Sequence, residues 1–448
     1  MGRPPKVQQT LMTMPAEAPA RDIARIPLSP DFGWRWAASL IASVAMVFVL
    51  AYAVGLAVFV GVGVWGINVP FVWGFDLTNY VWWIGLANGC SLFAAILVLR
   101  RHSLRTAINR FAEGLALFAV ICAGVFPIIH LGRPWLFYWM FPYPAEFQVW
   151  PQFRSPLTWD FWAIITHLMV TTMLWYVGLI PDLATLRDRA RSVAAKRVFA
   201  VFALGWRSSI RHWAFHQRAY RLVAIAVIPL VLVIQSTIAF EFAVTLVPDW
   251  HETRLPLHFI VSGLESGLAL ILFAAAALRT SLRLERYIDD EDMDLIGKLL
   301  LANALVSAYV YAGEIGVALF ADDFAQTAAL NRMLGDYASL YWGTIALSVI
   351  VPQVLWLRNV RLNDGLSLLV GLAVTAGIWL DRLSLVVAGI QRDYLPSMWR
   401  TYSPTAPEWY LFLGSIGLIA ALFLLFVRYL PVISMSETRH DEHLESRS

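Results

Sequence analysis

The chain has 448 residues, of which 59% are hydrophobic and only 15% are charged. Soluble domains carry about 25% charged residues, so this composition excludes an ordinary soluble protein. The formal net charge of +3 argues against nucleic acid as a partner, and 20 tryptophans are typical of a protein that contacts both interfaces of a lipid bilayer.

The first 35 residues are rich in Pro, Ala and Arg and contain no apolar core. We expect residues 1–35 to form a cytoplasmic tail that is flexible at its start and then lies along the membrane surface. A secretory signal peptide is not expected, because the first apolar stretch is too long and has no cleavage-site pattern.

Ten apolar stretches are long enough to cross about 30 Å of hydrocarbon. They lie near residues 36–60, 78–99, 108–129, 159–180, 220–247, 254–278, 293–320, 338–357, 366–390 and 408–430. The sequence therefore predicts an all-α integral membrane protein with about ten transmembrane helices and a transmembrane domain at 36–430.

The positive charges predict the orientation of these helices. With the N-terminus in the cytoplasm, 26 of the 34 Lys and Arg residues lie on the cytoplasmic side, six lie on the outer side and two lie within helices. Cytoplasmic loops are enriched in Lys and Arg, so both termini are expected inside, with a cytoplasmic C-terminal tail at 431–448.

Two of the predicted loops are long. The outer loop, residues 130–158, is crowded with aromatic residues and Pro, so we expect an ordered loop that offers a docking surface; simple anchoring at the interface is the alternative. The inner loop, residues 181–219, contains LRDRARSVAAKR, which predicts a basic amphipathic helix on the anionic cytoplasmic leaflet.

The sequence predicts no metal site, iron–sulphur cluster or haem within this chain. Cys90 and Cys122 lie in apolar runs, at depths roughly 8 Å apart, so we expect no disulfide. A cluster needs a set of Cys ligands, and bis-histidine haem needs two His at similar depth, whereas His167 is the single His deep within a predicted span. Three further histidines near the outer edge could pair in principle: His130, His251 and His258.

Ionisable side chains within a membrane are costly and usually functional. Seven lie within the predicted spans: Glu113, Glu241, Glu265, Lys298, Glu314, Asp381 and Arg382. The topology places four side chains at one level just below the outer surface: His130, Asp160, Glu241 and Arg382. A base, two carboxylates and a cation are therefore expected together in an apolar bundle.

This set suits the oxidation of a quinol, which releases two electrons and two protons. A ring hydroxyl can donate its proton to a neutral His or to a carboxylate as the electron leaves. Structural roles are the alternative. Asp160 could cap a helix, Asp381 and Arg382 could form a structural pair, and His130 could face interfacial water.

Four further ionisable residues lie at several depths and could form a proton route. They are Glu113, Glu265, Lys298 and Glu314. Isolated polar groups that water satisfies are the alternative.

Long stretches from the third predicted span onward carry a family resemblance. They are NRFAEGLALFAVICAGVFPIIHLGRPWLFYWMFPYP (109–144), FRSPLTWDFWAI (153–164), YVGLIPDLATLRDRA (176–190), GWRSSIRHW (205–213), VPDWHET (247–253), PQVLWLRNVR (352–361) and LPSMWRTYSPTAPEW (395–409). The chain resembles the polysulphide-reductase-like, NrfD-type membrane subunits, most closely the larger such subunit of alternative complex III.

The resemblance implies two four-helix bundles, at 78–247 and 254–390, flanked by the helices at 36–60 and 408–430. It implies a multi-pass protein of the bacterial inner membrane. It also implies a subunit of an oxidoreductase that is not active alone and that oxidises menaquinol or ubiquinol near the periplasmic face.

The resemblance implies that His130 and Asp160 are catalytic. The quinol-binding set implied by resemblance and depth together is His130, Arg133, Asp160, Glu241, Asp381 and Arg382. Two positions depart from the family pattern. Glu241 stands where Asp is common, and Asn88 stands where a His of a proton path is common, which questions coupled proton translocation but not quinol oxidation.

The resemblance further implies several partners. An iron–sulphur subunit would dock on the periplasmic face, beside a second membrane subunit and multihaem and monohaem cytochrome c subunits that pass electrons onward, in some cases to a terminal oxidase. Two alternatives stay open. One is the quinone-reactive subunit of a molybdopterin sulphur-compound oxidoreductase. The other is a transporter or channel, which predicts a polar cavity at the midplane.

Overall fold

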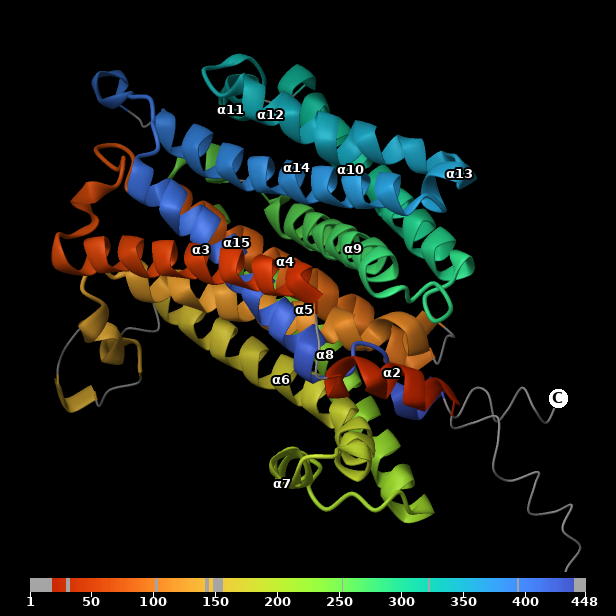
Figure 1. Ribbon diagram of the computed structural model, residues 1–448. Coiled ribbons are helices and arrows are strands. Elements are labelled where there is room, and N and C mark those ends of the chain that lie inside the picture. The colour runs from red at the N-terminus through yellow and green to blue at the C-terminus, as the bar shows by residue number, and fades with distance from the viewer. Residues whose placement is uncertain are drawn as a thin grey trace, which may run out of the picture.

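The computed structural model describes residues 18–29, 33–100, 104–141, 145–147, 156–251, 253–320, 323–392 and 395–438. Within these residues, ten helices are long and apolar enough to cross a membrane, which confirms the predicted all-α, ten-span architecture. The spans run roughly side by side across the width of Figure 1.

Most spans begin and end within a few residues of the predicted positions. The spans are α3 (Gly33–Phe59), α4 (Phe75–Arg100), α5 (Leu104–His130), α6 (Pro156–Arg189), α8 (Ile210–Ala243), α9 (Leu255–Leu282), α10 (Asp290–Phe320), the composite span α12 (Ala338–Thr344), η6 (Ile345–Ile350) and η7 (Val351–Trp356), then α14 (Asp364–Gln391) and α15 (Ala406–Tyr429). By contrast, α6 ends nine residues later and α8 begins ten residues earlier than predicted. The shorter helices are α2 (Ala18–Leu28), η1 (Val62–Val64), η2 (Pro134–Met140), η3 (Ala145–Phe147), α7 (Val193–Phe202), η5 (Pro248–Trp250), α11 (Asp323–Leu334), α13 (Arg358–Arg361) and η8 (Pro396–Met398).

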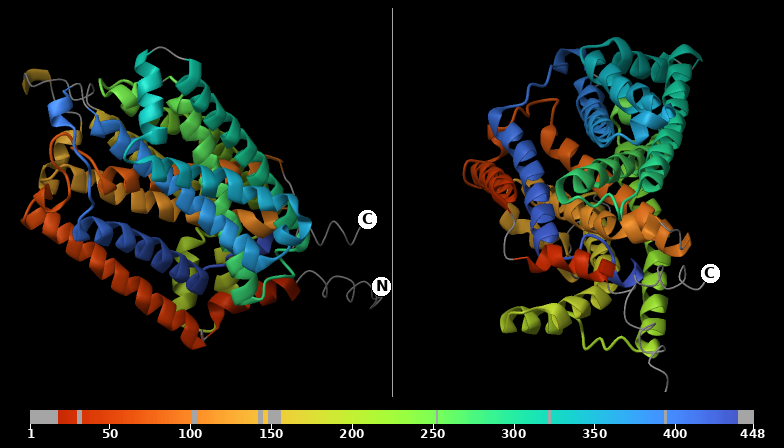
Figure 2. Two further views of the ribbon diagram at one scale, coloured as in Figure 1. Left: turned by 90° about the horizontal axis from the view of Figure 1, so that it is seen from above. Right: turned by 45° about the vertical axis from the view of Figure 1, so that its right-hand side comes forward.

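The spans form two bundles of four. Helices α4, α5, α6 and α8 pack together, and α9, α10, the composite span and α14 form the second bundle. The flanking helices α3 and α15 pack on each other, and α15 also contacts α4 and α5 (Figures 1 and 2). The first and last spans therefore form one pair beside the first bundle.

The composite span is irregular. A regular α-helix over Ala338–Thr344 passes into a π-helix and then into a 3-10 helix that begins at Val351. Pro352 lies in the first turn of that 3-10 helix, where its missing N–H costs no hydrogen bond. The prediction of a span at 338–357 is correct, and the proline accounts for the change of helix type.

The two bundles meet where α4 packs closely on α9. Gly89 faces Gly263 and Gly267, and a Cβ atom built on Gly89 would overlap the carbonyl oxygen of Gly263. Small residues let two helix backbones approach in a membrane, where packing rather than the hydrophobic effect holds helices together. The glycines therefore set the distance between the two bundles.

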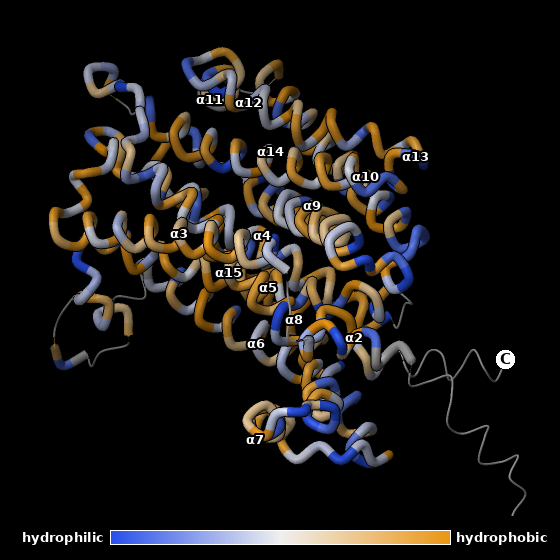
Figure 3. Tube along the Cα trace, viewed as in Figure 1, coloured by the Kyte–Doolittle hydropathy of each residue, from blue (hydrophilic) through white to orange (hydrophobic). Residues whose placement is uncertain are grey.

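Helix α3 illustrates the contact with lipid. It is apolar over most of its length (Figure 3), yet its buried residues are few: Ser43, Leu50, Ala53 and Ala57. Exposed side chains such as Phe48 and Tyr52 cover its other faces. A helix with this distribution is expected to face lipid chains.

The prediction of one basic amphipathic helix over LRDRARSVAAKR in the inner loop has the wrong bounds. The segment LRDR ends α6, which continues through Arg189, and a separate short helix, α7, starts at Val193. Buried Leu186 and Ala190 hold the end of α6 against the protein, so α6 extends beyond the apolar stretch that the sequence marks.

Both tail regions contain ordered segments at the basic side of the protein. In α2, Ile23 and Ala24 are buried. After α15, Met435 is buried, and Glu437 forms an ion pair with Arg105 at the start of α5. Residues 1–17 and 439–448 of the predicted tails lie outside the described residues.

The close contact between α4 and α9 is tested by two substitutions one helical turn apart. We expect Gly89→Ala to destabilise the protein by about 1–3 kcal/mol, because its methyl group would push the two backbones apart. Gly85→Ala is the control, since its added methyl would lie 3.9 Å from the nearest atoms. Thermal unfolding of the purified proteins in detergent measures both, and equal midpoints would contradict the proposed role.

Candidate functional site

A cluster of acid and base side chains lies at the end of the first bundle that the charge bias predicts to face outward, which we call the outer end. Asp76 and Tyr80 come from the first turns of α4, and His130 is the last residue of α5. The Nε2 atom of His130 lies 3.3 Å from Oδ2 of Asp76, and the hydroxyl of Tyr80 donates a 2.6 Å hydrogen bond to Asp160. The rings of Tyr80 and His130 meet edge to face at 6.1 Å.

Asp160 also contacts a second carboxyl group. It lies near the start of α6, and Glu241 lies near the end of α8, so both are at the outer end of the bundle. Their carboxyl groups are within hydrogen-bonding range of each other. A hydrogen bond between two carboxyl groups requires that one of them holds a proton, so this pair can store and release a proton. We call Asp76, Tyr80, His130, Asp160 and Glu241 the outer cluster.

Some polar atoms of the outer cluster have capacity for a further partner. Nε2 of His130 and Oδ2 of Asp76 face each other at 3.3 Å without a hydrogen bond of good geometry, and Oε1 of Glu241 is buried without one in the described part of the chain. Buried polar groups are usually satisfied, and an exception needs an explanation such as a ligand. The outer cluster could therefore receive the hydroxyl groups of a bound molecule.

The outer cluster lies close to the lipid-facing side of α8. Glu241 is half-buried, and its neighbours Phe240 and Val244 are exposed. An apolar ligand arriving from the bilayer would reach Glu241 first at this edge.

Sequence analysis missed two members of the outer cluster. Asp76 and Tyr80 are four residues apart, so they lie on one face of α4. The apolar pattern placed the start of this span at residue 78, which left Asp76 in a loop. The spacing of the two polar residues was the signal that could have found them.

Arg382 has separate contacts in the second bundle. Its guanidinium bonds Asp381 at 2.9 Å and Ser262, and it lies 4.0 Å from the centre of the Phe259 ring. Of the four residues predicted at one level, the structure brings three together: His130, Asp160 and Glu241, with Tyr80 in contact with both His130 and Asp160. Arg382 is separate from them, because its partners are Asp381 and Ser262.

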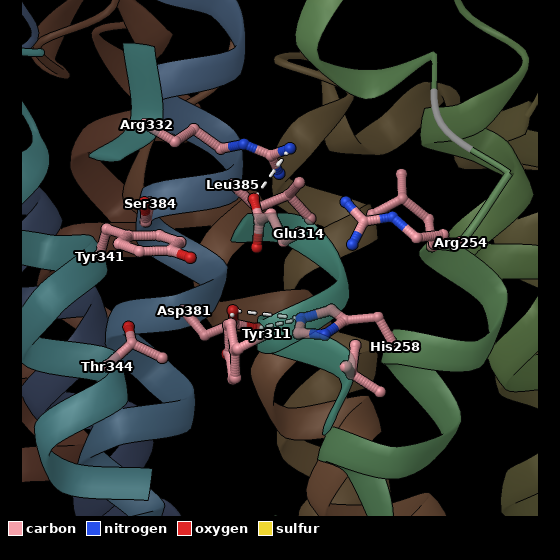
Figure 4. Close-up of a pocket in the computed structure, with 12 residues that line it drawn as sticks. Arg254, His258, Tyr311, Glu314, Arg332, Tyr341, Thr344, Asp381, Ser384 and Leu385 are labelled. Atoms are coloured by element: carbon pink, nitrogen blue, oxygen red, sulfur yellow. Dashed lines mark hydrogen bonds and ion pairs between the residues drawn. The ribbon is translucent and has the colours of Figure 1, made fainter. Parts of the chain in front are cut away.

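Figure 4 shows this second polar cluster. His258 of α9 and Tyr311 of α10 converge on Asp381 of α14 at 3.0 Å and 2.8 Å, while Glu314 and Arg332 form a 3.0 Å ion pair nearby. Each charge is matched by an opposite charge or a donor, as expected for buried ionic groups that support a fold. The roles predicted for Asp381 and Arg382 in quinol binding stay predictions.

Three other residues singled out by the sequence lie away from both clusters. Arg133 is exposed at the start of η2, and its predicted contact with quinol stays a prediction. The deep histidine His167 has a polar neighbour, since its Nε2 lies 3.0 Å from the hydroxyl of Ser91. Asn88, where the resemblance leads us to expect a His, donates a hydrogen bond to Gln235.

The four residues of the possible proton route lie in separate environments. Glu113 bonds Tyr220 and Asn109 near the inner side of the first bundle. Glu265 accepts a hydrogen bond from Ser307 in the second bundle.

The other two residues of the route are also apart. Lys298 has a side chain that is 57% exposed and pairs with Asp294, whereas Glu314 lies at the outer side of the second bundle and pairs with Arg332. The described contacts do not connect the four residues, and the route stays a prediction.

Among the described residues, no group of three or more His, Cys, Asp or Glu side chains is arranged to hold a metal ion. The side chains of the outer cluster can accept, hold and release protons.

Comparison with known proteins gives the family. The family model described as "Polysulphide reductase, NrfD" matches residues 63–392, which is most of the chain and includes every member of the outer cluster. The chain belongs to this family.

Two relatives of the NrfD-family chain are similar over most of their length. It is 25% identical to a selenate reductase subunit of Mesobacillus selenatarsenatis over 393 residues, covering 83% of this chain and 88% of that protein. It is 23% identical to a putative dimethyl sulfoxide reductase membrane subunit of Halobacterium salinarum over 414 residues, covering 84% of this chain and 89% of that protein.

The second polar cluster is tested through its central carboxylate. Asp381→Asn leaves the buried Arg382 without its counter-charge, so we expect a loss of about 3–5 kcal/mol in the free energy of unfolding. The control is Asp290→Asn, because Asp290 pairs with Arg279 but is 61% exposed, and such pairs contribute about 0–1 kcal/mol. Thermal unfolding in detergent compares the two, and an unchanged midpoint for Asp381→Asn would contradict a structural role for the pair.

Proposed function

We propose that this NrfD-family chain is the quinol-oxidising membrane subunit of a respiratory oxidoreductase complex. The observation that carries the proposal is the outer cluster, where His130 faces Asp76 beside the contacting carboxyl groups of Asp160 and Glu241. These are proton acceptors of the kind that quinol oxidation needs, in an apolar bundle at one face of the membrane.

The reaction can be balanced on these residues. A quinol loses two O–H bonds and forms two C=O bonds, and two electrons and two protons leave the ring. One proton passes to the imidazole ring of His130, whose Nε2 faces Asp76, so that the carboxylate stabilises the ring when it is charged. The other passes to the pair of Asp160 and Glu241. The protons leave on the outer side, and the electrons pass to an iron–sulphur centre of a neighbouring subunit.

The outer loop is the proposed docking surface for the iron–sulphur subunit. Helix η2 exposes four aromatic side chains, with Trp135 at 56% and Tyr138 at 52%, beside Phe137 and Trp139. An exposed aromatic group of this size suits a protein interface as well as a membrane interface. Residues 142–144 and 148–155 of the predicted ordered loop lie outside the described residues.

Two kinds of complex fit this role. The resemblance of the motifs favours alternative complex III, with a second membrane subunit, multihaem and monohaem cytochrome c subunits and, in some cases, a terminal oxidase in the inner membrane. The names of the two relatives, which are subunits of reductases, favour instead the alternative, the quinone-reactive membrane subunit of a molybdopterin oxidoreductase.

A transporter has less support. It requires a polar cavity at the midplane, whereas the cavity between Asn88, Gln235 and Gly263 in the middle of α4, α8 and α9 is about 10 Å³. A space of this size holds about one water molecule.

Removal of the proton acceptors should stop turnover. In the purified complex, we expect His130→Ala and Asp160→Asn each to lower quinol oxidation by a factor of about 10²–10⁴ while the complex still assembles. The matched controls are His251→Ala and Glu146→Gln, which remove exposed outer residues and should leave turnover unchanged. Wild-type rates in either site variant, measured with a soluble quinol, would count against this site.

The partners are tested by purifying the complex from membranes. Multihaem cytochrome subunits with their haem absorption would support alternative complex III, and a molybdopterin subunit without haem would support the reductase.

In the same preparation, Trp135→Ser combined with Tyr138→Ser should release the iron–sulphur subunit. Full retention of that subunit would favour interfacial anchoring as the role of these aromatics.

A further inference from the structure

A large groove lies between the flanking helices and the second bundle. Helices α14 and α15 both pack on α4, and the space between them is lined by α4, α9, α14, α15 and the start of α3. Its volume is about 1800 Å³. Pockets for small molecules are typically about 300–1,000 Å³, so the groove is larger than a small polar ligand needs.

The interior of the groove is apolar. Its deeper part is lined by aromatic side chains, among them Trp82, Trp379 and Phe412, and aliphatic residues of α9, α14 and α15 line its length. It runs from the basic side, where α9 ends, to the outer halves of α4 and α15. A groove of this length and composition suits hydrocarbon chains that lie parallel to the helices.

The mouth of the groove on the basic side is ringed by arginines. Arg25 of α2, Arg35 of α3, and Arg283 and Arg286 after α9 line it, with Asp22 as the one acidic residue of the lining. All four arginines are exposed. Among the described residues, no carboxylate forms an ion pair with any of them, although Arg35 lies 6.0 Å from the ring centre of Trp34 and Arg286 lies 5.9 Å from that of Tyr287. The charges are therefore not neutralised and can attract an anionic ligand.

Helix α2 fixes part of this mouth in place. Tyr287, beyond the end of α9, donates a 3.3 Å hydrogen bond to Asp22, and Arg428 of α15 bonds the carbonyl of Pro27. Arg25 is therefore held on the same rim as Arg283 and Arg286. The arginines therefore share one rim of the groove.

We infer that the groove binds a two-chain anionic phospholipid, with its phosphate at the arginine rim and its acyl chains along α14 and α15. The positive-inside rule places the rim at the cytoplasmic leaflet, which carries the anionic lipids. A guanidinium group forms paired hydrogen bonds with phosphate oxygens. A quinol fits the rim less well, because its ring has no anionic group to match four arginines.

The experiment titrates the full-length chain in detergent with dioleoyl phosphatidylglycerol and, separately, with dioleoyl phosphatidylcholine, and counts bound lipids by native mass spectrometry. We expect one phosphatidylglycerol to remain bound at energies that remove phosphatidylcholine. The variant Arg25→Gln/Arg283→Gln/Arg286→Gln should lose affinity by about fivefold per arginine, or roughly a hundredfold in total.

Two control variants separate the groove from general charge and bulk. Lys196→Gln/Arg197→Gln/Arg218→Gln removes the same charge from exposed positions on the same side and should retain the lipid. Ala376→Trp fills the groove from the exposed face of α14 and should exclude the lipid, whereas Ala302→Trp on the lipid-facing side of α10 should not.

Three results would overturn the inference. Equal retention of the two lipids would remove the headgroup specificity. Unchanged phosphatidylglycerol binding in both the arginine variant and Ala376→Trp would place the lipid elsewhere. A quinone that co-purifies with the native complex and is lost in Ala376→Trp, or a protein subunit lost in the arginine variant, would assign the groove to another occupant.

Discussion

The close packing of α4 on α9 is the constraint on which the rest of the structure depends. Gly89 meets Gly263 and Gly267 without side chains between them, so α4 is buried on nearly all faces and both bundles are built around it. The same helix carries Asp76 and Tyr80 to the outer cluster, and it forms the floor of the apolar groove. One helix thus fixes the position of a proposed reaction site and of a proposed lipid site.

The buried charges are divided among networks that differ in whether an arginine balances the carboxylates. In the inner half of the first bundle, Arg110 pairs with Asp182 and Glu113, and in the second bundle Asp381 is matched by Arg382 and His258. Removing one partner from such a buried pair is costly, so these charges support the fold. The outer cluster differs, because it brings the carboxyl groups of Asp160 and Glu241 into contact, and among the described residues no Arg or Lys pairs with either of them. That difference is why the proposed chemistry is assigned there.

Apolar length and charge bias were enough to predict the ten spans, because the membrane requires both properties of every span. The level of His130, Asp160 and Glu241 also followed from topology, since depth is set by position along a helix. The pair of Asp381 and Arg382 was one of the alternatives that the sequence left open, but the contacts of Arg382 with Ser262 and Phe259 could not be predicted, because depth does not tell which neighbouring helix a side chain faces. Asp76 was missed because a polar residue in the first turn of a span interrupts the apolar pattern that marks the span.

The most direct test is a structure of the intact complex, determined by electron cryomicroscopy with a tightly bound quinol analogue. The account predicts density for the ring at the outer end of the first bundle, with one ring oxygen within hydrogen-bonding distance of His130 and the other beside Asp160 and Glu241. A ring bound near the cytoplasmic ends of the helices, or between Asp381 and His258 in the second bundle, would contradict it.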